Sequence, residues 1–284
     1  MMSSVHFLLN QASKKLVDAI GLAHAEASLE VNLLLQHLLK VNRAWLISHD
    51  RDVLTDDQQQ DFYALLQRRL AGEPIAYILG VREFYGLPLK VTPATLIPRP
   101  DTETLVDAAF QKIPVNGAWD ILDLGTGTGA VALAIAKHRP KSHVIGVDAS
   151  AEALAVAIEN AQNLDLKNVS LLKSNWFSDL AAKRFDVIVS NPPYIAEADC
   201  HLTQGDLRFE PHSALASGFD GLDDIRLIIQ EASNYLKPNG WLMLEHGYDQ
   251  AHSVAALLKE YGFGQIDHAR DLAGILRVTF GSIA

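Results

Sequence analysis

Residues 120–130 read DILDLGTGTGA, and the fold class follows from this stretch. An apolar segment runs into three glycines at alternating positions, and an alanine-rich segment follows them. Glycine lets the chain turn sharply and lets a ligand approach the main chain without a Cβ in the way. A strand, a glycine loop and a helix in this order are typical of a cofactor loop in an α/β protein. The residues expected to contact the cofactor are Gly125, Thr126, Gly127, Thr128 and Gly129.

Strands and helices continue to alternate beyond this loop. We expect helices at 130–138, 151–163, 223–236 and 251–261, and strands at 121–124, 143–147, 169–172, 185–190, 241–245, 265–270 and 275–280. Strands that are linked through helices form a mostly parallel sheet with helices on both faces. The last two strands are separated by a short break, so we expect them to pair antiparallel.

The N-terminal part of the chain has a different pattern. The first 75 or so residues show helical periodicity, and Thr55 with Gln58 resembles a capping box. Short apolar pieces broken by glycine and proline follow, which indicates a β-hairpin. We therefore expect a small helical domain at 1–76, a hairpin linker at 77–98 and an α/β domain at 99–284.

Composition excludes several classes of protein. The chain has 284 residues, of which 49% are hydrophobic and 20% charged, as in ordinary globular proteins. No apolar run approaches the roughly 20 residues that cross a bilayer, and the N-terminus lacks the pattern of a secretory signal. The single cysteine, Cys200, fits a reducing compartment, so we expect the cytoplasm. The histidines show no metal-binding spacing, so no metal is expected. A net charge of −10 argues against binding of long nucleic acid.

The glycine loop alone leaves the cofactor open. Its spacing also satisfies the G-x-G-x-x-A form of a dinucleotide-binding loop, and Asp148 at the end of the next strand suits the ribose of either cofactor. Asp123, just before the glycines, favours a cationic ligand over a pyrophosphate. S-adenosylmethionine carries a sulfonium and an ammonium, so Asp123 tips the balance towards it. The alternative for Asp123 is a carboxylate that only braces the loop.

Residues 190–194 read SNPPY and directly follow an expected strand. Asn191 and the carbonyl of Pro192 offer two acceptors for the two N–H bonds of an amide or an exocyclic amine. With both hydrogens held, the nitrogen lone pair can point at a methyl donor. Pro193 stiffens the loop, and Tyr194 supplies a flat wall for a planar group. The motif therefore predicts N-methylation of adenine in nucleic acid or of glutamine in protein.

Further stretches resemble the PrmC/HemK family of peptide-chain release factor methyltransferases along nearly the whole chain. These stretches are residues 69–80, Phe84 with Gly86 and Leu87, and residues 96–103, 208–211 and 244–247. The resemblance implies a class I S-adenosylmethionine-dependent methyltransferase with a Rossmann-like sheet of seven strands, mostly parallel with an antiparallel last strand. It also implies transfer to the side-chain nitrogen N5 of the glutamine in the Gly-Gly-Gln motif of class 1 release factors, with S-adenosylhomocysteine as the product.

The resemblance also suggests roles for individual residues. Trp176 is expected to stack on adenine, and Asn175, where the family commonly has an acid, is expected to bond to its amino group. Phe84 and Arg99 are expected to contact the substrate. The alternatives are a core tryptophan at 176, hairpin packing for Phe84, and an ion pair between Arg99 and Glu103.

Two other functions stay open at this stage. An adenine N6 methyltransferase acting on DNA or RNA would share the motif at 190–194, but it would need a basic target-binding region that the sequence does not show. A nonenzymatic protein could use the helical domain to dock on the translation apparatus and keep the cofactor fold as a relic. The intact motif disfavours that interpretation.

Overall fold

The computed structural model describes residues 4–180 and 183–284, so residues 1–3 of the expected helical domain lie outside it. The chain divides into two compact units, Met1–Gly80 and Val81–Ala284. Each unit has its own hydrophobic core. No helix among the described residues combines the length and apolar character needed to cross a membrane.

The first unit is helical. Its helices are α1 (Val5–Ile20), α2 (His24–Leu39), α3 (Arg43–Ser48), α4 (Asp56–Leu70) and α5 (Ile75–Leu79). The capping box that opens α4 is present, because Thr55 Oγ1 accepts from the backbone of Gln58 and the side chain of Gln58 accepts from the backbone of Thr55. Buried leucines of α1, α2 and α4 surround Phe62 in a single core.

The second unit begins with a hairpin of β1 (Val81–Phe84) and β2 (Leu87–Lys90). The hairpin therefore starts later than the expected linker at 77–98, because residues 75–79 form α5. It is tied to the helix α8 (Ala151–Asn163) through Asn160, whose side chain donates to the carbonyl of Lys90 and accepts from its N–H. Phe84 is buried in the core of this unit, with an exposed fraction of 1%.

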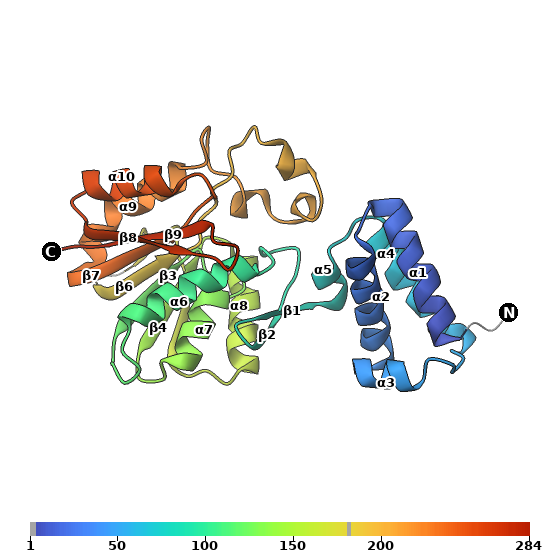
Figure 1. The fold of residues 1–284 in the computed structure, drawn as a ribbon. Coiled ribbons are helices and arrows are strands. Elements are labelled where there is room, and N and C mark those ends of the chain that lie inside the picture. The colour runs from blue at the N-terminus through green and yellow to red at the C-terminus, as the bar shows by residue number, and fades with distance from the viewer. Residues whose placement is uncertain (1–3, 181–182) are drawn as a thin grey trace. The chain divides into compact units, whose positions relative to one another are not determined.

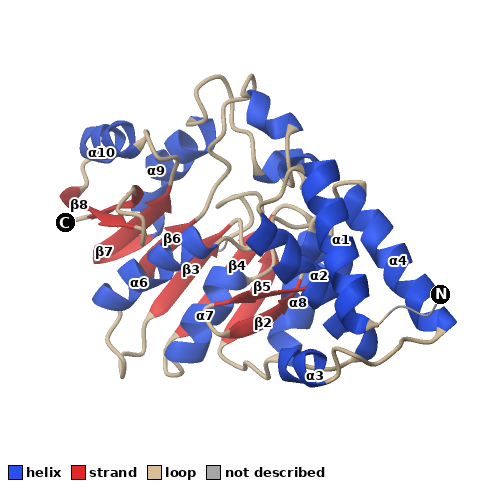
Figure 2. Cartoon of the chain, turned by 45° about the vertical axis from the view of Figure 1, so that its right-hand side comes forward, coloured by secondary structure: helices blue, strands red, loops and turns tan. Residues whose placement is uncertain are grey.

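A seven-stranded sheet forms the centre of the second unit (Figure 2). Its strands are β3 (Asp120–Leu124), β4 (His143–Asp148), β5 (Val169–Lys173), β6 (Phe185–Ser190), β7 (Leu236–Glu245), β8 (Gly264–Arg270) and β9 (Leu276–Ser282). The spatial order is β5-β4-β3-β6-β7-β9-β8. The five strands β3 to β7 pair parallel, and β9 runs antiparallel to both of its neighbours. This confirms the expected sheet.

Helices cover both faces of the sheet (Figure 1). On one face lie α6 (Glu103–Lys112), α7 (Ala130–His138) and α8 (Ala151–Asn163), and on the other lie α9 (Asp223–Tyr235) and α10 (Ala251–Glu260). Each face has its own apolar cluster, as expected for a sheet buried on both sides. Short 3-10 helices lie at Pro100–Thr102, Cys200–Thr203, Leu207–Phe209 and His212–Ala214.

The direction of strand order reverses between β3 and β6. The chain passes outward from β3 to β4 and β5, and then returns to the other side of β3 with β6 and β7. Leu124 and Ser190, the last residues of β3 and β6, are direct neighbours in the register. The glycine loop and the motif at 191–194 therefore leave the sheet side by side, at the position where open α/β sheets bind ligands.

Candidate active site

A cavity of about 440 Å³ opens at the carboxyl ends of β3, β4 and β6. Most of the residues that the sequence singled out line it. These are Arg99, Asp123, Gly125, Thr126, Gly127, Thr128, Asp148, Asn175, Trp176, Asn191 and Pro193. Pro192 and Tyr194 line a neighbouring cavity of about 60 Å³, which Arg99 and Asn191 also border. Gly129 and Phe84 line neither cavity.

The glycines shape the wall of the larger cavity. Gly125, Gly127 and Gly129 have φ values of 69°, 55° and 84°, which residues other than glycine rarely adopt. A Cβ on Gly125 would come within 3.3 Å of the Trp176 ring. Gly129 is the N-cap of α7, and a Cβ there would lie 2.9 Å from Leu133 Cδ1. Gly129 therefore serves the packing between loop and helix.

Asp123 braces the glycine loop. Its Oδ2 accepts from the hydroxyl of Thr126 at 2.6 Å and from the backbone of Ala132 at 3.2 Å. Burial raises the pKa of this carboxyl to about 7, and the nearby charge of Asp148 adds to the rise. A carboxyl with this pKa is only partly ionised at neutral pH. The bracing interpretation thus has direct support, although Asp123 also borders the cavity.

Asp148 ends β4 beside the same loop. Its Oδ2 accepts from the backbone of Gly127 at 2.9 Å, and its Oδ1 accepts from the backbone of Ser150 at 2.9 Å. These bonds fix the carboxylate at the rim of the cavity while each oxygen keeps a further lone pair. The group is therefore preset to accept hydrogen bonds from a vicinal diol.

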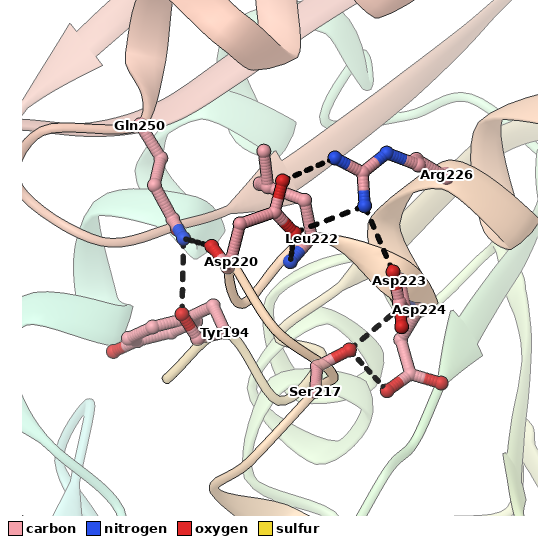
Figure 3. Close-up of polar contacts among 8 residues, drawn as sticks. All are labelled: Tyr194, Ser217, Asp220, Leu222, Asp223, Asp224, Arg226 and Gln250. Carbon is pink, nitrogen blue, oxygen red and sulfur yellow. Dashed lines mark hydrogen bonds and ion pairs between the residues drawn. The ribbon is translucent and has the colours of Figure 1, made fainter. Parts of the chain in front are cut away.

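Trp176 forms another part of the wall. Its backbone has a φ of 50°, and its Nε1 donates to Asp224 Oδ1 at 3.2 Å. Asp224 is fixed in turn, since its Oδ2 accepts from the hydroxyl of Ser217 at 2.6 Å (Figure 3). The ring is thus held from one edge. Sequence reasoning missed Asp224, which is 48 residues away from Trp176 and carries no local signal.

The motif at 191–194 is held from three directions. Asn191 Nδ2 donates to Thr102 Oγ1 at 3.2 Å, and the hydroxyl of Tyr194 donates to Glu245 Oε1 at 3.3 Å. Gln250 Nε2 donates to the main-chain carbonyl of Tyr194 at 3.0 Å (Figure 3). Burial raises the pKa of Glu245 to about 7 and the pKa of Tyr194 well above its usual value. Thr102 and Gln250 were not expected at the site.

Arg99 pairs with Glu210, and the alternative pairing with Glu103 is wrong. Arg99 Nη2 lies 2.6 Å from Glu210 Oε1, whose side chain is fully buried. Burial raises the pKa of Glu210 to about 7, although Arg99 opposes that rise. Glu103 instead accepts from the backbone of Tyr85. Arg99 borders both cavities, so its expected contact with a substrate stays a prediction.

Phe84 does not lie at the site. Its ring is enclosed by the core of the second unit, where it packs with Leu87 and Leu89. A ring with an exposed fraction of 1% has no free face for a substrate. Its position therefore corresponds to the alternative of hairpin packing.

One cluster among the described residues has the donor types of a metal site. Asp199 caps the short 3-10 helix that begins with Cys200 and His201, and Asp199 Oδ1 is 2.6 Å from His201 Nδ1. The histidine spacing gave no sign of it, because only one of the three donors is a histidine. Two of the three residues are exposed, and the cluster lies outside both cavities.

Comparison with known proteins connects this geometry to a family. Residues 116–275 match the family model of a methyltransferase domain, and residues 8–80 match that of the PrmC N-terminal domain. The release factor glutamine methyltransferase of Salmonella typhimurium is 49% identical over 252 residues, which cover 89% of this chain and 91% of the relative. The protein of the same name from Escherichia coli is 48% identical over 252 residues, with the same two coverages, 89% and 91%.

A solved structure agrees at the level of the fold. A methyltransferase from Pyrococcus furiosus superposes with a TM-score of 0.54 at 21% identity, over 76% of this chain and 96% of that one. Identity this low supports the fold alone. The similarity to the two curated relatives supports more than the fold, because their sequences match the chain across both of its units. The chain belongs to the family of release factor glutamine methyltransferases.

Proposed function

We propose that this protein transfers a methyl group from S-adenosylmethionine to the side-chain nitrogen N5 of the glutamine in the Gly-Gly-Gln motif of class 1 release factors. Its curated relatives carry the name of this activity. The observation that carries the proposal is the Asn191 carboxamide at the junction of the two cavities. Its nitrogen is engaged by Thr102, which leaves Oδ1 as an acceptor for an amide substrate.

The larger cavity fits the cofactor. Asp148 offers acceptors for the ribose hydroxyls, Trp176 offers a flat face for adenine, and Asn175 lies beside it with a side-chain oxygen for the adenine amino group. A Cβ on Gly125 would lie tightly against the Trp176 ring, at 3.3 Å, and glycine leaves bare main chain at this part of the wall. When bound, the cofactor supplies a methyl group on a positively charged sulfur, and the carbon of this methyl group is the electrophile.

The chain's own contribution to the reaction is to orient a poor nucleophile. An amide nitrogen shares its lone pair with the carbonyl, so it must be held in line with the methyl group. Asn191 Oδ1 and the carbonyl of Pro192 accept hydrogen bonds from the two N–H groups of the glutamine side chain, and Tyr194 bounds the smaller cavity. The new nitrogen–carbon bond would form as the sulfur–methyl bond of the bound cofactor breaks, and one of those protons would pass to solvent, so that the product amide is neutral.

The helical unit, Met1–Gly80, is the part that we assign to docking of the release factor. It matches the PrmC N-terminal domain over residues 8–80, and the described residues that line the cavities all belong to the second unit. Both observations support a division between a docking unit and a catalytic unit. The reaction belongs in the cytoplasm, where release factors act.

Transfer of tritiated methyl from S-adenosylmethionine tests the proposal. The substrates are purified class 1 release factors, the same factors with alanine in place of the Gly-Gly-Gln glutamine, and an adenine-containing duplex. Label on the unaltered factor alone is expected. Asn191→Ala is expected to lose transfer while it keeps its affinity for the cofactor in calorimetry. Label on the duplex, or equal label on the altered factor, would overturn the assignment of the acceptor.

A further inference from the structure

Gln250 joins three loops at the carboxyl edge of the sheet. It is the N-cap of α10, and it is partly buried. Its Nε2 donates to the main-chain carbonyl of Tyr194 at 3.0 Å and to that of Asp220 at 3.3 Å (Figure 3). Its Oε1 accepts from the backbone N–H of Gly247 at 2.8 Å. The loop that carries the motif at 191–194 is thus tied to the loops before α9 and α10.

The orientation of the Gln250 amide follows from the chemistry of its partners. A main-chain carbonyl can only accept a hydrogen bond, and a main-chain N–H can only donate one. The amide nitrogen therefore has to face the two carbonyls, and the amide oxygen has to face Gly247. The reversed amide would set its oxygen against two carbonyl oxygens, so the three bonds can form in one orientation only.

Gly221 lets the chain pass directly against the Tyr194 carbonyl. It is buried and has a φ of 77°. A Cβ there would lie 2.2 Å from the Tyr194 oxygen and 2.9 Å from Gln250 Nε2. Non-bonded heavy atoms pack best at about 3.5–4.0 Å, so a side chain at 221 would displace the Tyr194 carbonyl, Gln250 or both. This position therefore requires glycine both for its backbone conformation and for its contact with the motif.

The motif depends on such contacts from outside. Pro192 and Pro193 have no N–H, so this part of the main chain cannot be tied to its neighbours through donors of its own. Their fixed φ angles leave few soft torsions between Ser190, at the end of β6, and Tyr194. A hold on the Tyr194 carbonyl therefore constrains the path of the chain through both prolines, and with it the position of the Pro192 carbonyl.

We propose that Gln250 and Gly221 are positioning residues, which hold the motif at 191–194 in the geometry that the reaction needs. This inference rests on the proposed function. Both residues lie outside the two cavities, so they act on a substrate only through Tyr194 and the chain before it. A motif that is released at Tyr194 presents its acceptors to the substrate amide in the wrong place, whereas the glycine loop that bounds the larger cavity is unchanged.

Substitutions at Gln250 separate its donor groups from its packing. Gln250→Glu keeps the shape but sets an oxygen against the two carbonyls, and Gln250→Met keeps the length without a donor or a charge. Asn168→Asp is the matched control, because Asn168 is also partly buried in the second unit and its Nδ2 also donates to main-chain carbonyls, those of Ala136, Arg139 and Ser142. It precedes β5, at the amino end of the sheet, and lines neither cavity.

Gly221→Ala tests the contact with the main chain of Tyr194. Gly262→Ala is its matched control, because Gly262 has a similar φ of 83°, but a Cβ there would meet no heavy atom of the described residues within 4 Å. Both substitutions strain the backbone in the same way. Only the clash with Tyr194 and Gln250 distinguishes them.

The measurements on each full-length variant are kcat and KM for the release factor, the Kd for S-adenosylmethionine and the free energy of unfolding in urea. Gln250→Glu and Gly221→Ala are expected to lower kcat roughly 100-fold, the scale of a misplaced reacting group, with Kd unchanged. Gln250→Met loses the donors without adding repulsion, so its kcat should fall less. Asn168→Asp and Gly262→Ala are expected to lose stability but to keep the kcat of the unaltered protein.

The inference is overturned if Gln250→Glu keeps the kcat of Asn168→Asp, or if Gly221→Ala keeps that of Gly262→Ala. A loss of affinity for S-adenosylmethionine as large as the loss of kcat would also contradict it, because the two residues would then shape the larger cavity instead of the motif. If Gln250→Glu does not fold, Gln250→Met decides, and an unaltered kcat in that variant refutes the inference. Lack of transfer by the unaltered protein would instead count against the proposed function.

Discussion

The ring of Trp176 is the largest flat surface in the wall of the larger cavity. It packs against Gly125 on one side and is fixed through its Nε1 by Asp224. Stacking of a base on an aromatic ring contributes about 1–3 kcal/mol. Trp176→Ala is therefore expected to weaken S-adenosylmethionine binding about tenfold or more in calorimetry. Trp176→Phe keeps a ring but loses the bond to Asp224, so its loss should be smaller.

Trp119→Ala is the matched control for that experiment. Trp119 is also partly buried and packs on the core of the second unit, but it does not line the cavity. Its loss should reduce stability without changing the affinity for the cofactor. If Trp176→Ala bound the cofactor as tightly as Trp119→Ala does, the alternative of a core tryptophan at 176 would be correct.

Asp123 gives the stability of the protein a specific dependence on pH. Burial raises the pKa of this carboxyl from 3.8 to about 7. Between those two values the folded protein keeps a proton that the unfolded chain has released. The free energy of unfolding therefore falls as the pH rises through this window, and the contribution present at low pH is lost near pH 7. The loss is on the order of a few kcal/mol.

The neutral variant Asp123→Asn isolates this effect. It keeps an oxygen that can accept from Thr126 and Ala132, but it has no proton to lose. Urea unfolding at a series of pH values should show Asp123→Asn gaining stability relative to the unaltered protein as the pH rises. Parallel curves for the unaltered protein and Asp123→Asn would contradict the prediction.

At the scale of elements, one buried ion pair joins α2 to α4. Arg69 Nε and Nη2 lie 2.7 Å and 3.1 Å from the two carboxylate oxygens of Glu30, and both side chains are less than one tenth exposed. Removal of one partner of a buried ion pair costs about 3–5 kcal/mol, because the remaining charge loses the attraction that offset its burial. Glu30→Ala should therefore lower the free energy of unfolding by that amount, as measured by urea unfolding followed through helical circular dichroism.

The neighbouring pair, Arg68 with Glu73, is a built-in control. It has the same two-point geometry, at 2.7 Å and 2.6 Å, but the Arg68 side chain is 46% exposed. Exposed pairs contribute about 0–1 kcal/mol, so Glu73→Ala should change stability little. Equal losses for Glu30→Ala and Glu73→Ala would show that burial does not decide the strength of these pairs.

Elements whose signals are local could be predicted from the sequence. The helices expected at 130–138 and 151–163 coincide with α7 and α8, because an apolar period and, for α8, the cap at Ser150 define them within a few residues. β7 begins at Leu236, five residues before the expected strand at 241–245. The expected start was too late because the Pro238-Asn239-Gly240 segment resembles a turn. The pairing of Leu236 with Phe185 across the sheet extends it.

The parts of the site that could not be predicted depend on long-range contacts. The glycines and Asn191 directly follow strands and Asp148 ends one, so the parallel sheet brings them to one edge. Glu210 reaches Arg99 across 111 residues of sequence, and Thr102 reaches Asn191 across 89. Such pairs depend on how loops and helices pack above the sheet, and no spacing in the chain encodes them.

At the scale of the whole molecule, the chain forms two compact units. The second unit has a complete sheet with an apolar cluster on each face, so residues 81–284 are expected to fold without the helical unit. All residues that line the two cavities belong to this unit. The fragment 81–284 should therefore bind S-adenosylmethionine with the affinity of the full chain, and calorimetry would measure both.

The same fragment should be a poor enzyme on an intact release factor. Loss of the docking unit is expected to raise the KM for the factor about tenfold or more, which corresponds to at least 1.4 kcal/mol of binding, with a smaller effect on kcat. A short Gly-Gly-Gln peptide offers no surface for the helical unit, so the fragment and the full chain should methylate it equally well. If the fragment kept the full chain's KM for the intact factor, docking would reside in the catalytic unit. If its affinity for the cofactor fell, the helical unit would be supporting the cavity instead of the partner.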